Sequence, residues 1–170
     1  MREGSNLLNL PPSGDPIGVF SPPSPLPDRP PPPFDPGTEA RLNTLRPDTQ
    51  ALARRHLQNA RDLGLDPRIR DLGGARTRAG QIRAGRQTAI AARPGNSPHE
   101  YGAGYDITLL DETGRPVSAG NYYGRLQYEA LQQEGLDLGL QLGPPGDYGH
   151  FELPQWRQLP GLSPYSGPQL

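Results

Sequence analysis

Residues 97–110 read SPHEYGAGYDITLL, a stretch that joins a turn-forming run to a strand. The second half, from Tyr105 to Leu110, has the apolar and β-branched residues that are typical of a β-strand. The first half places His99, one of three histidines in the chain, seven positions before Asp106 with glycines between them. Because glycines let a loop curl tightly, both side chains can face one cleft. The same residues also suit a solvated turn, so a metal site here requires a further partner.

Three helices and three further strands are expected around this strand. The first helix begins at Pro47, because proline suits the first helical turn, and ends at Gly64. The last helix spans about 122–134 and ends at Gly135. The other expected elements are a short helix over 79–86 and strands over 68–72, 136–142 and 150–153. The apolar residues expected to face inward are Leu52, Ala53, Leu57, Ala60 and Leu63 in the first helix, and Leu126, Ala130 and Leu131 in the last. This order predicts an α+β domain with a small antiparallel sheet and flanking helices.

The start of the chain differs in composition from the rest. Of 170 residues 23 are proline, and they are concentrated over residues 10–36, LPPSGDPIGVFSPPSPLPDRPPPPFDP. Each proline removes a backbone donor and fixes φ, so neither a helix nor a sheet ladder can propagate there. We therefore expect a disordered Pro-rich arm or linker over 1–37 and one domain over 38–170. The arm suits a spacer, and a ligand for a proline-reading partner is the alternative.

The composition excludes several kinds of chemistry. All 17 basic residues are arginine, which excludes Ser-Lys and Schiff-base mechanisms. Cysteine is absent, which excludes thiol nucleophiles and Cys-ligated zinc. A net charge of −1 provides no field that would favour nucleic acid or an anionic membrane. No segment has the roughly 20 apolar residues of a membrane span.

The remaining chemistry-bearing residues suit a hydrolytic zinc cleft. Such a site needs three protein ligands and an open position for water. His99 and Asp106 can supply two ligands, and His150, in a strand that can lie beside that of Asp106, is the third candidate. Asp147, in the Gly-flanked turn GDYGH, is placed to act as general base. Taken singly, each is also explained as a turn or packed strand residue. The remaining histidine, His56, is interpreted as packing or solvent-facing.

These motifs resemble those of the zinc peptidases that act on the stem peptides of bacterial cell walls, the D-alanyl-D-alanine carboxypeptidases and L-alanyl-D-glutamate endopeptidases. SPHEYGAGYD is similar to the family's SxHxxGxAxD signature, with Gly104 in place of the usual alanine. DYGHFEL is similar to the second signature, and the resemblance covers about residues 45–153. It implies that His99, Asp106 and His150 bind one catalytic Zn²⁺. It also implies that Asp147 is the catalytic base.

Two shorter matches lie upstream of the zinc motif. Ala75-Arg76-Thr77 followed by Gln81 resembles the family's YRSxxxQ element. This implies that Arg76 holds the substrate and polarises its carbonyl, with Gln81 near it. RPGNS, which ends in Ser97, resembles the segment whose serine contacts substrate. Tyr148 can donate to the tetrahedral intermediate, although packing is its alternative role. Glu152 can orient a ligand histidine.

The resemblance implies zinc-dependent hydrolysis of an amide bond in the peptidoglycan stem peptide. The acidic base Asp147 and the HFE ending resemble the L-Ala-D-Glu endopeptidases more than the carboxypeptidases, so cleavage between L-Ala and D-Glu is favoured. A D-Ala-D-Ala carboxypeptidase is the near alternative. A non-catalytic cell-wall-binding module with a Pro-rich adaptor arm is another, although such a module has no need of Asp147.

The sequence also carries expectations about where the protein acts. Residues 1–14, MREGSNLLNLPPSG, lack the continuous apolar run of a classical secretory signal. We therefore expect synthesis in the cytoplasm and action in the periplasm or cell wall after delivery. The two routes are release as a phage or prophage lysin and injection as an antibacterial toxin. A toxin would require a cognate inhibitor protein, and the arm could engage the delivery machinery.

Overall fold

The computed structural model describes residues 33–88, 90–168 and 170. The expected arm over 1–37 lies mostly outside the described residues. Helix α1, Pro36–Leu42, begins within the last residues of that range. Asp35 caps it, because its carboxylate accepts a hydrogen bond from the backbone N–H of Thr38 at 3.0 Å. Phe34 packs against the core.

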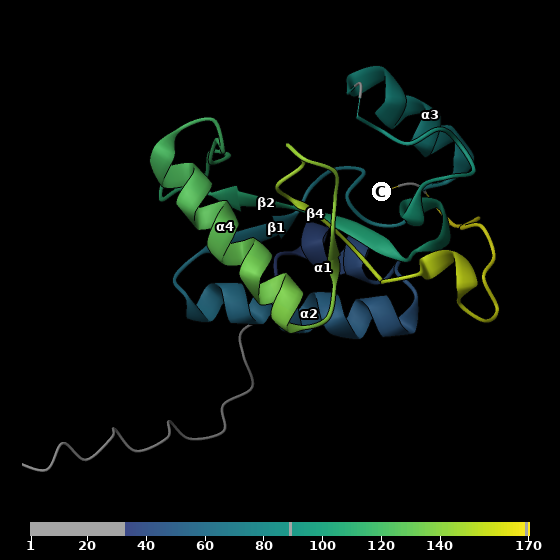
Figure 1. Cartoon of the computed structure of the whole chain (residues 1–170), viewed down its shortest axis with the longest axis horizontal. Helices are drawn as coiled ribbons and strands as arrows, with labels where there is room; N and C mark the ends of the chain where they lie inside the picture. The colour runs from purple at the N-terminus through teal and green to yellow at the C-terminus, as the bar shows by residue number, and fades with distance from the viewer. Residues whose placement is uncertain (1–32, 89, 169) are drawn as a thin grey trace, which may run out of the picture. The chain divides into compact units, whose positions relative to one another are not determined.

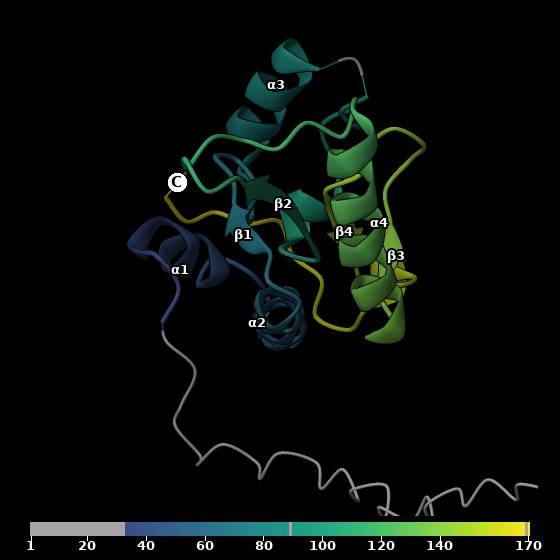
Figure 2. The ribbon, with the colours of Figure 1, turned by 90° about the vertical axis from the view of Figure 1, so that its left-hand side faces the viewer.

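The strands form the small antiparallel sheet that the sequence predicts. They are β1 (Asp66–Ile69), β2 (Gly104–Leu110), β3 (Gln141–Leu142) and β4 (His150–Glu152). Their order is β1-β2-β4-β3, and each neighbouring pair is antiparallel (Figures 1 and 2). The expected α+β class is confirmed. The register of β2 and β4 sets Asp106 directly opposite His150, which joins two motifs that are far apart in the sequence.

Three longer helices flank the sheet. They are α2 (Pro47–Asp62), α3 (Arg78–Gln87) and α4 (Tyr122–Asp137). Figures 1 and 2 show α2 and α3 on opposite sides of the strands. Two single 3₁₀ turns, η1 (Pro98–Tyr101) and η2 (Trp156–Gln158), complete the described elements. None of the described helices combines the length and apolar character that a membrane span requires.

The inward face of α2 was predicted correctly except at its end. Ala53, Leu57 and Ala60 are fully buried, and Leu52 packs against the core. The prediction for Leu63 was wrong. This residue follows the last turn of α2, and its side chain is 55% exposed.

The inward face and the end of α4 were predicted less well. Leu131 is buried as expected, but Leu126 is 45% exposed and Ala130 also faces solvent. The buried face of the helix is a narrow stripe at helical spacing, formed by Gly124, Tyr128, Leu131 and Gly135. The helix runs past Gly135 to Asp137, so the expected strand over 136–142 is reduced to Gln141–Leu142.

His56 is a packing residue, as one of its two interpretations predicted. The ring is fully buried, with Nε2 2.8 Å from the carbonyl oxygen of Leu131 and Nδ1 2.9 Å from the hydroxyl of Tyr105. Because a carbonyl can only accept, Nε2 carries the proton and Nδ1 accepts from the hydroxyl. Burial lowers the pKa of His56 to about 4, so the ring is neutral at neutral pH. It links α2 to β2 and α4.

Candidate metal centre and cleft

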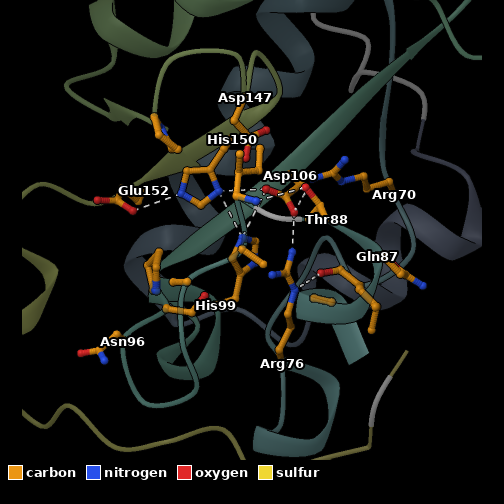
Figure 3. Close-up of a pocket in the computed structure, with 18 of the residues that line it drawn as sticks. Arg70, Arg76, Gln87, Thr88, Asn96, His99, Asp106, Asp147, His150 and Glu152 are labelled. Atoms are coloured by element: carbon orange, nitrogen blue, oxygen red, sulfur yellow. Dashed lines mark hydrogen bonds and ion pairs between the residues drawn. The ribbon is translucent and has the colours of Figure 1, made fainter. Parts of the chain in front are cut away.

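Three buried side chains from three elements meet at one point. His99 comes from η1, Asp106 from β2 and His150 from β4 (Figure 3). One ligand atom from each lies within 4.8 Å of the others. Oδ1 of Asp106 is 3.2 Å from Nε2 of His99 and 2.9 Å from Nδ1 of His150. The structure therefore brings together the three residues that the sequence motifs selected, in a group that can hold a metal ion.

Each histidine ring is oriented by its outer nitrogen. Nδ1 of His99 lies 2.9 Å from the carbonyl oxygen of Gly74, which can only accept, so this nitrogen carries the proton. Nε2 of His150 lies 3.1 Å from the carboxylate of Glu152. The two inner nitrogens therefore point at Asp106 and are the atoms available to a metal. Glu152 thus contacts His150, and its part in orienting a metal ligand stays a prediction.

The charges of the two rings differ. Burial lowers the pKa of His99 to about 4. Burial also lowers the pKa of His150, but the bonds to Asp106 and Glu152 outweigh it and raise that pKa to about 9. Without a metal, His150 is therefore protonated at neutral pH and donates to both carboxylates. Loss of that proton frees Nδ1 as a ligand atom.

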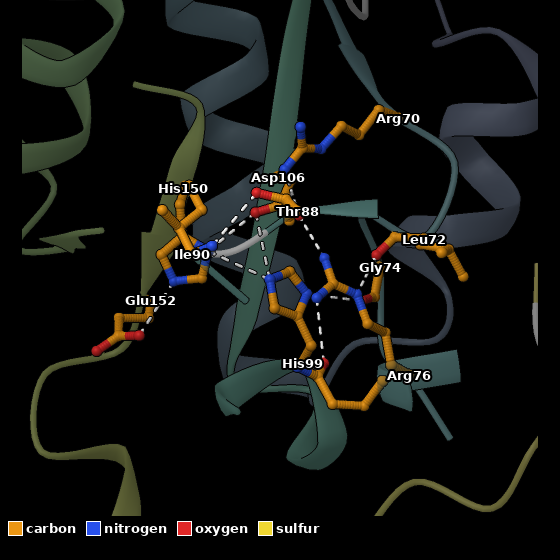
Figure 4. A network of polar contacts seen from close by, with 11 residues as sticks. Arg70, Leu72, Gly74, Arg76, Thr88, Ile90, His99, Asp106, His150 and Glu152 are labelled. Atoms are coloured by element: carbon orange, nitrogen blue, oxygen red, sulfur yellow. Dashed lines mark hydrogen bonds and ion pairs between the residues drawn. The ribbon is translucent and has the colours of Figure 1, made fainter. Parts of the chain in front are cut away.

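Two arginines hold the second oxygen of Asp106. The guanidinium groups of Arg76 and Arg70 both contact Oδ2, the latter at 2.9 Å (Figure 4). Burial raises the pKa of Asp106, but the interactions with His99 and His150 outweigh it and hold the pKa well below its usual range. Asp106 is therefore a carboxylate with Oδ2 held by arginines and Oδ1 facing the two rings. Arg70 was not expected in the site, because it belongs to no motif.

Arg76 is held in place by its surroundings. Its Nε donates to the carbonyl of Leu72, and Nη1 donates to the side-chain oxygen of Gln81 at 3.2 Å. Gln81 in turn donates to the carbonyl of Ala92 at 2.7 Å and is 1% exposed. Gln81 thus lies behind Arg76, where it positions the guanidinium. Its contact with substrate stays a prediction.

We call His99, Asp106 and His150 the metal group, because together they can hold a metal ion. A cavity of about 380 Å³ opens beside this group. Its lining includes all three candidate ligands together with Arg76, Ser97 and Asp147, so the structure gathers these predicted residues around one space. Asp147 is partly buried, and this burial raises the pKa of its carboxyl, with a further contribution from the charge of Asp106. Tyr148 packs against the core, with its ring centroid 6.3 Å from that of Tyr128, and its role toward substrate stays a prediction.

The C-terminal segment forms another wall of this cavity. Trp156 is 4% exposed, belongs to the hydrophobic core and also lines the cavity. The segment is tied down by backbone hydrogen bonds from Leu153 to Ala103 and from Tyr165 to Glu100. Trp156 therefore both packs across the domain and lines the cavity.

Comparison with known proteins finds similarity among solved structures. No family model matches the chain, and no curated protein matches it. Among solved structures, it is similar to the crystal structure of the Serratia marcescens L-Ala D-Glu endopeptidase ChiX. The two chains are 22% identical with a TM-score of 0.49, and the match covers 71% of this chain and 88% of the other. The likeness is one of fold.

Proposed function

We propose that this protein is a zinc-dependent peptidase of peptidoglycan stem peptides. The observation that carries the proposal is the convergence of His99, Asp106 and His150 within 4.8 Å beside a cavity that Asp147 and Arg76 also line. Three such ligands leave a coordination position open, as a hydrolytic zinc site requires. When bound, zinc would supply a Lewis acid that polarises a carbonyl and acidifies water.

Asp147 is the proposed general base. Its raised pKa makes the carboxylate a better proton acceptor than an exposed aspartate. It takes the proton of the attacking water and returns it to the nitrogen of the leaving amine. A binding module has no use for such a group in the cavity, so its place in the lining favours catalysis.

Arg76 and Arg70 have a supporting part in this proposal. Both contact Asp106 and both line the cavity, so they fix the aspartate and give the cavity positive charge. Arg76 is the more buried, at 7% exposed, and is held by Leu72 and Gln81. A buried, preoriented guanidinium stabilises negative charge that develops on a carbonyl oxygen.

The bond that we propose is the amide between L-Ala and D-Glu. The sequence motifs favour this bond through Asp147 and the HFE ending. Action in the periplasm or cell wall, delivery as a lysin or toxin, a cognate inhibitor and a delivery partner for residues 1–37 stay predictions of the sequence.

The proposal is tested by digestion of purified peptidoglycan with the zinc-loaded protein. Wild type and Asp147→Asn are compared with and without a chelator, and products are identified by mass spectrometry. We expect new amino termini at D-Glu. Asp147→Asn should retain one zinc per chain but lose a factor of about 10² to 10⁴ in rate, the usual contribution of a general base.

The other outcomes separate the alternatives. Release of terminal D-Ala would assign the carboxypeptidase activity instead. Absence of any product from folded, zinc-loaded protein would overturn the peptidase proposal and leave the wall-binding module. If Asp147→Asn cuts as fast as wild type, Asp147 is not the base.

A further inference from the structure

The cavity beside the metal group is lined by three arginines that differ in their partners. Arg70 and Arg76 both contact the carboxylate of Asp106, so each already has an acidic partner. Arg157 lines the same cavity, and among the described residues no carboxylate pairs with it. Glu152, the acidic residue of the cavity lining that is nearest to Arg157 in the sequence, contacts His150 instead. Arg157 is therefore a cation of the cleft that has no counter-ion within the described fold.

Arg157 is held in place although its side chain is exposed. Its guanidinium lies over the ring of Trp156, 4.3 Å from the centroid, and Nη2 donates to the carbonyl of Asn96 at 3.2 Å. Trp156 is itself buried, with its ring centroid 5.2 Å from that of Tyr101. The guanidinium of Arg157 is thus fixed before any ligand arrives, which lowers the entropy lost when it binds an anion.

The backbone before this pair supports the same conclusion. Gln155 has φ of 51°, a left-handed conformation that a residue with a side chain adopts at a cost of about 1 kcal/mol or more. This turn directs Trp156 into the core while Arg157 stays at the cavity. The conformation is maintained by the packing of the segment, and its result is a fixed cation at the rim.

We propose that Arg157 binds a carboxylate of the substrate outside the reacting amide and so makes the enzyme selective for acidic stem peptides. The inference rests on the proposed function. In a peptide cut between L-Ala and D-Glu, the α-carboxylate of D-Glu sits on the carbon that bears the scissile nitrogen. A carboxylate can accept two hydrogen bonds from the guanidinium, whereas a carboxamide of the same shape is uncharged and offers one oxygen.

The test uses two tripeptides, L-Ala-γ-D-Glu-L-Lys and the same peptide with the D-Glu α-carboxylate converted to a carboxamide. We measure kcat/KM for both with wild type, Arg157→Gln, Arg157→Lys and Arg125→Gln. Arg125 is an exposed control on α4 outside the cavity lining. Wild type should prefer the carboxylate peptide about 10- to 100-fold, the range of a charge-assisted pair.

Arg157→Gln should lose this preference through a higher KM for the carboxylate peptide, with kcat/KM for the carboxamide peptide within about twofold of wild type. Arg157→Lys should keep part of the preference, and Arg125→Gln all of it. If Arg157 had only a structural role, its substitution would lower kcat/KM equally for both peptides. Selectivity unchanged in Arg157→Gln, or absent in wild type, overturns the inference.

A binding measurement separates this inference from the proposed function. The zinc-loaded Asp147→Asn protein, with and without Arg157→Gln, is titrated with each peptide by calorimetry. Stronger binding of the carboxylate peptide that depends on Arg157, without cleavage by wild type, supports the inference and contradicts the peptidase proposal. Cleavage of both peptides without a preference for the carboxylate peptide supports the peptidase proposal and contradicts the inference. If neither peptide is bound or cut, both are wrong.

Discussion

Glu152 supports His150 in the way that the Gly74 carbonyl supports His99, by accepting the outer ring N–H. We expect Glu152→Gln to weaken zinc binding about 10- to 100-fold, the usual effect of changing a group that orients a ligand histidine. The carboxamide oxygen can still accept the hydrogen bond, so the change removes charge rather than contact. The affinity is measured by competition with a chromogenic chelator.

A matched control for this variant is Glu129→Gln, because Glu129 is exposed on α4. It should bind zinc like wild type. If Glu152→Gln also binds like wild type, the carboxylate does not contribute to the ligand strength of His150.

His56 gives a prediction about pH. Its folded-state pKa is about 4, against 6.5 for the ordinary side chain, so the unfolded chain binds a proton between these values that the folded chain does not. Stability conferred by the neutral ring is therefore complete above pH 6.5 and is lost as the pH falls toward 4. Between pH 7 and pH 5 the loss should be about 2 kcal/mol.

The measurement is urea unfolding of wild type and His56→Gln at both pH values. Because the other titrating groups are common to the two proteins, the difference in their pH dependence reports His56. His56→Gln should be less stable at pH 7 but should lose about 2 kcal/mol less on acidification. Equal pH dependence in the two proteins would contradict the assigned role of burial.

At this scale, the sequence was enough to select the three candidate ligands, Glu152 and Arg76, but not Arg70. His99, Asp106 and His150 stand out because few other residue types remain for metal chemistry once cysteine is absent. Arg70 was missed because its place depends on backbone pairing in which Arg70 donates to Asp106 and Asp106 to Gly73. Contacts of this kind join residues more than 30 positions apart and leave no local pattern.

Two glycines inside helices give opposite predictions at the scale of the element. A Cβ at Gly135 of α4 would lie 2.7 Å from the ring of Phe151 and 3.2 Å from that of His56. A Cβ at Gly85 of α3 would meet no atom within 4 Å. Gly135→Ala should therefore cost about 1 to 3 kcal/mol by overpacking. Gly85→Ala should gain up to about 1 kcal/mol from helix propensity.

Urea unfolding of the two variants beside wild type measures both changes. The pair controls for the substitution itself, since both exchange glycine for alanine within a helix. Changes of the same sign would mean that contact at Gly135 does not limit the packing of α4 on the sheet.

The same glycine explains the largest error in the expected elements. Glycine commonly ends a helix, and the alternation of apolar and polar residues after Gly135 is typical of a strand. In the fold Gly135 instead provides the close approach of α4 to Phe151, so the helix continues to Asp137. Local rules predicted α2, α3 and β2 well because their ends coincide with local signals. They failed where a tertiary contact required the glycine.

For the whole molecule, the metal group joins η1, β2 and β4, which the chain otherwise holds together by packing and backbone pairing. The three ligand atoms meet only in the folded chain, so a metal that binds them stabilises that state by mass action. At a free zinc concentration 100 times the dissociation constant, the gain is about 3 kcal/mol. For a domain of this size that raises Tm by roughly 10 °C.

Thermal unfolding with a chelator and with added zinc measures this gain, and His150→Ala is the informative comparison. That variant loses one ligand of three, so zinc should shift its Tm little. An equal shift in wild type and His150→Ala would place the binding elsewhere in the chain. A wild type that zinc does not stabilise would mean that the protonated His150 and the two arginines on Asp106 already satisfy the group, and that it serves the fold as a buried ionic network rather than as a metal centre.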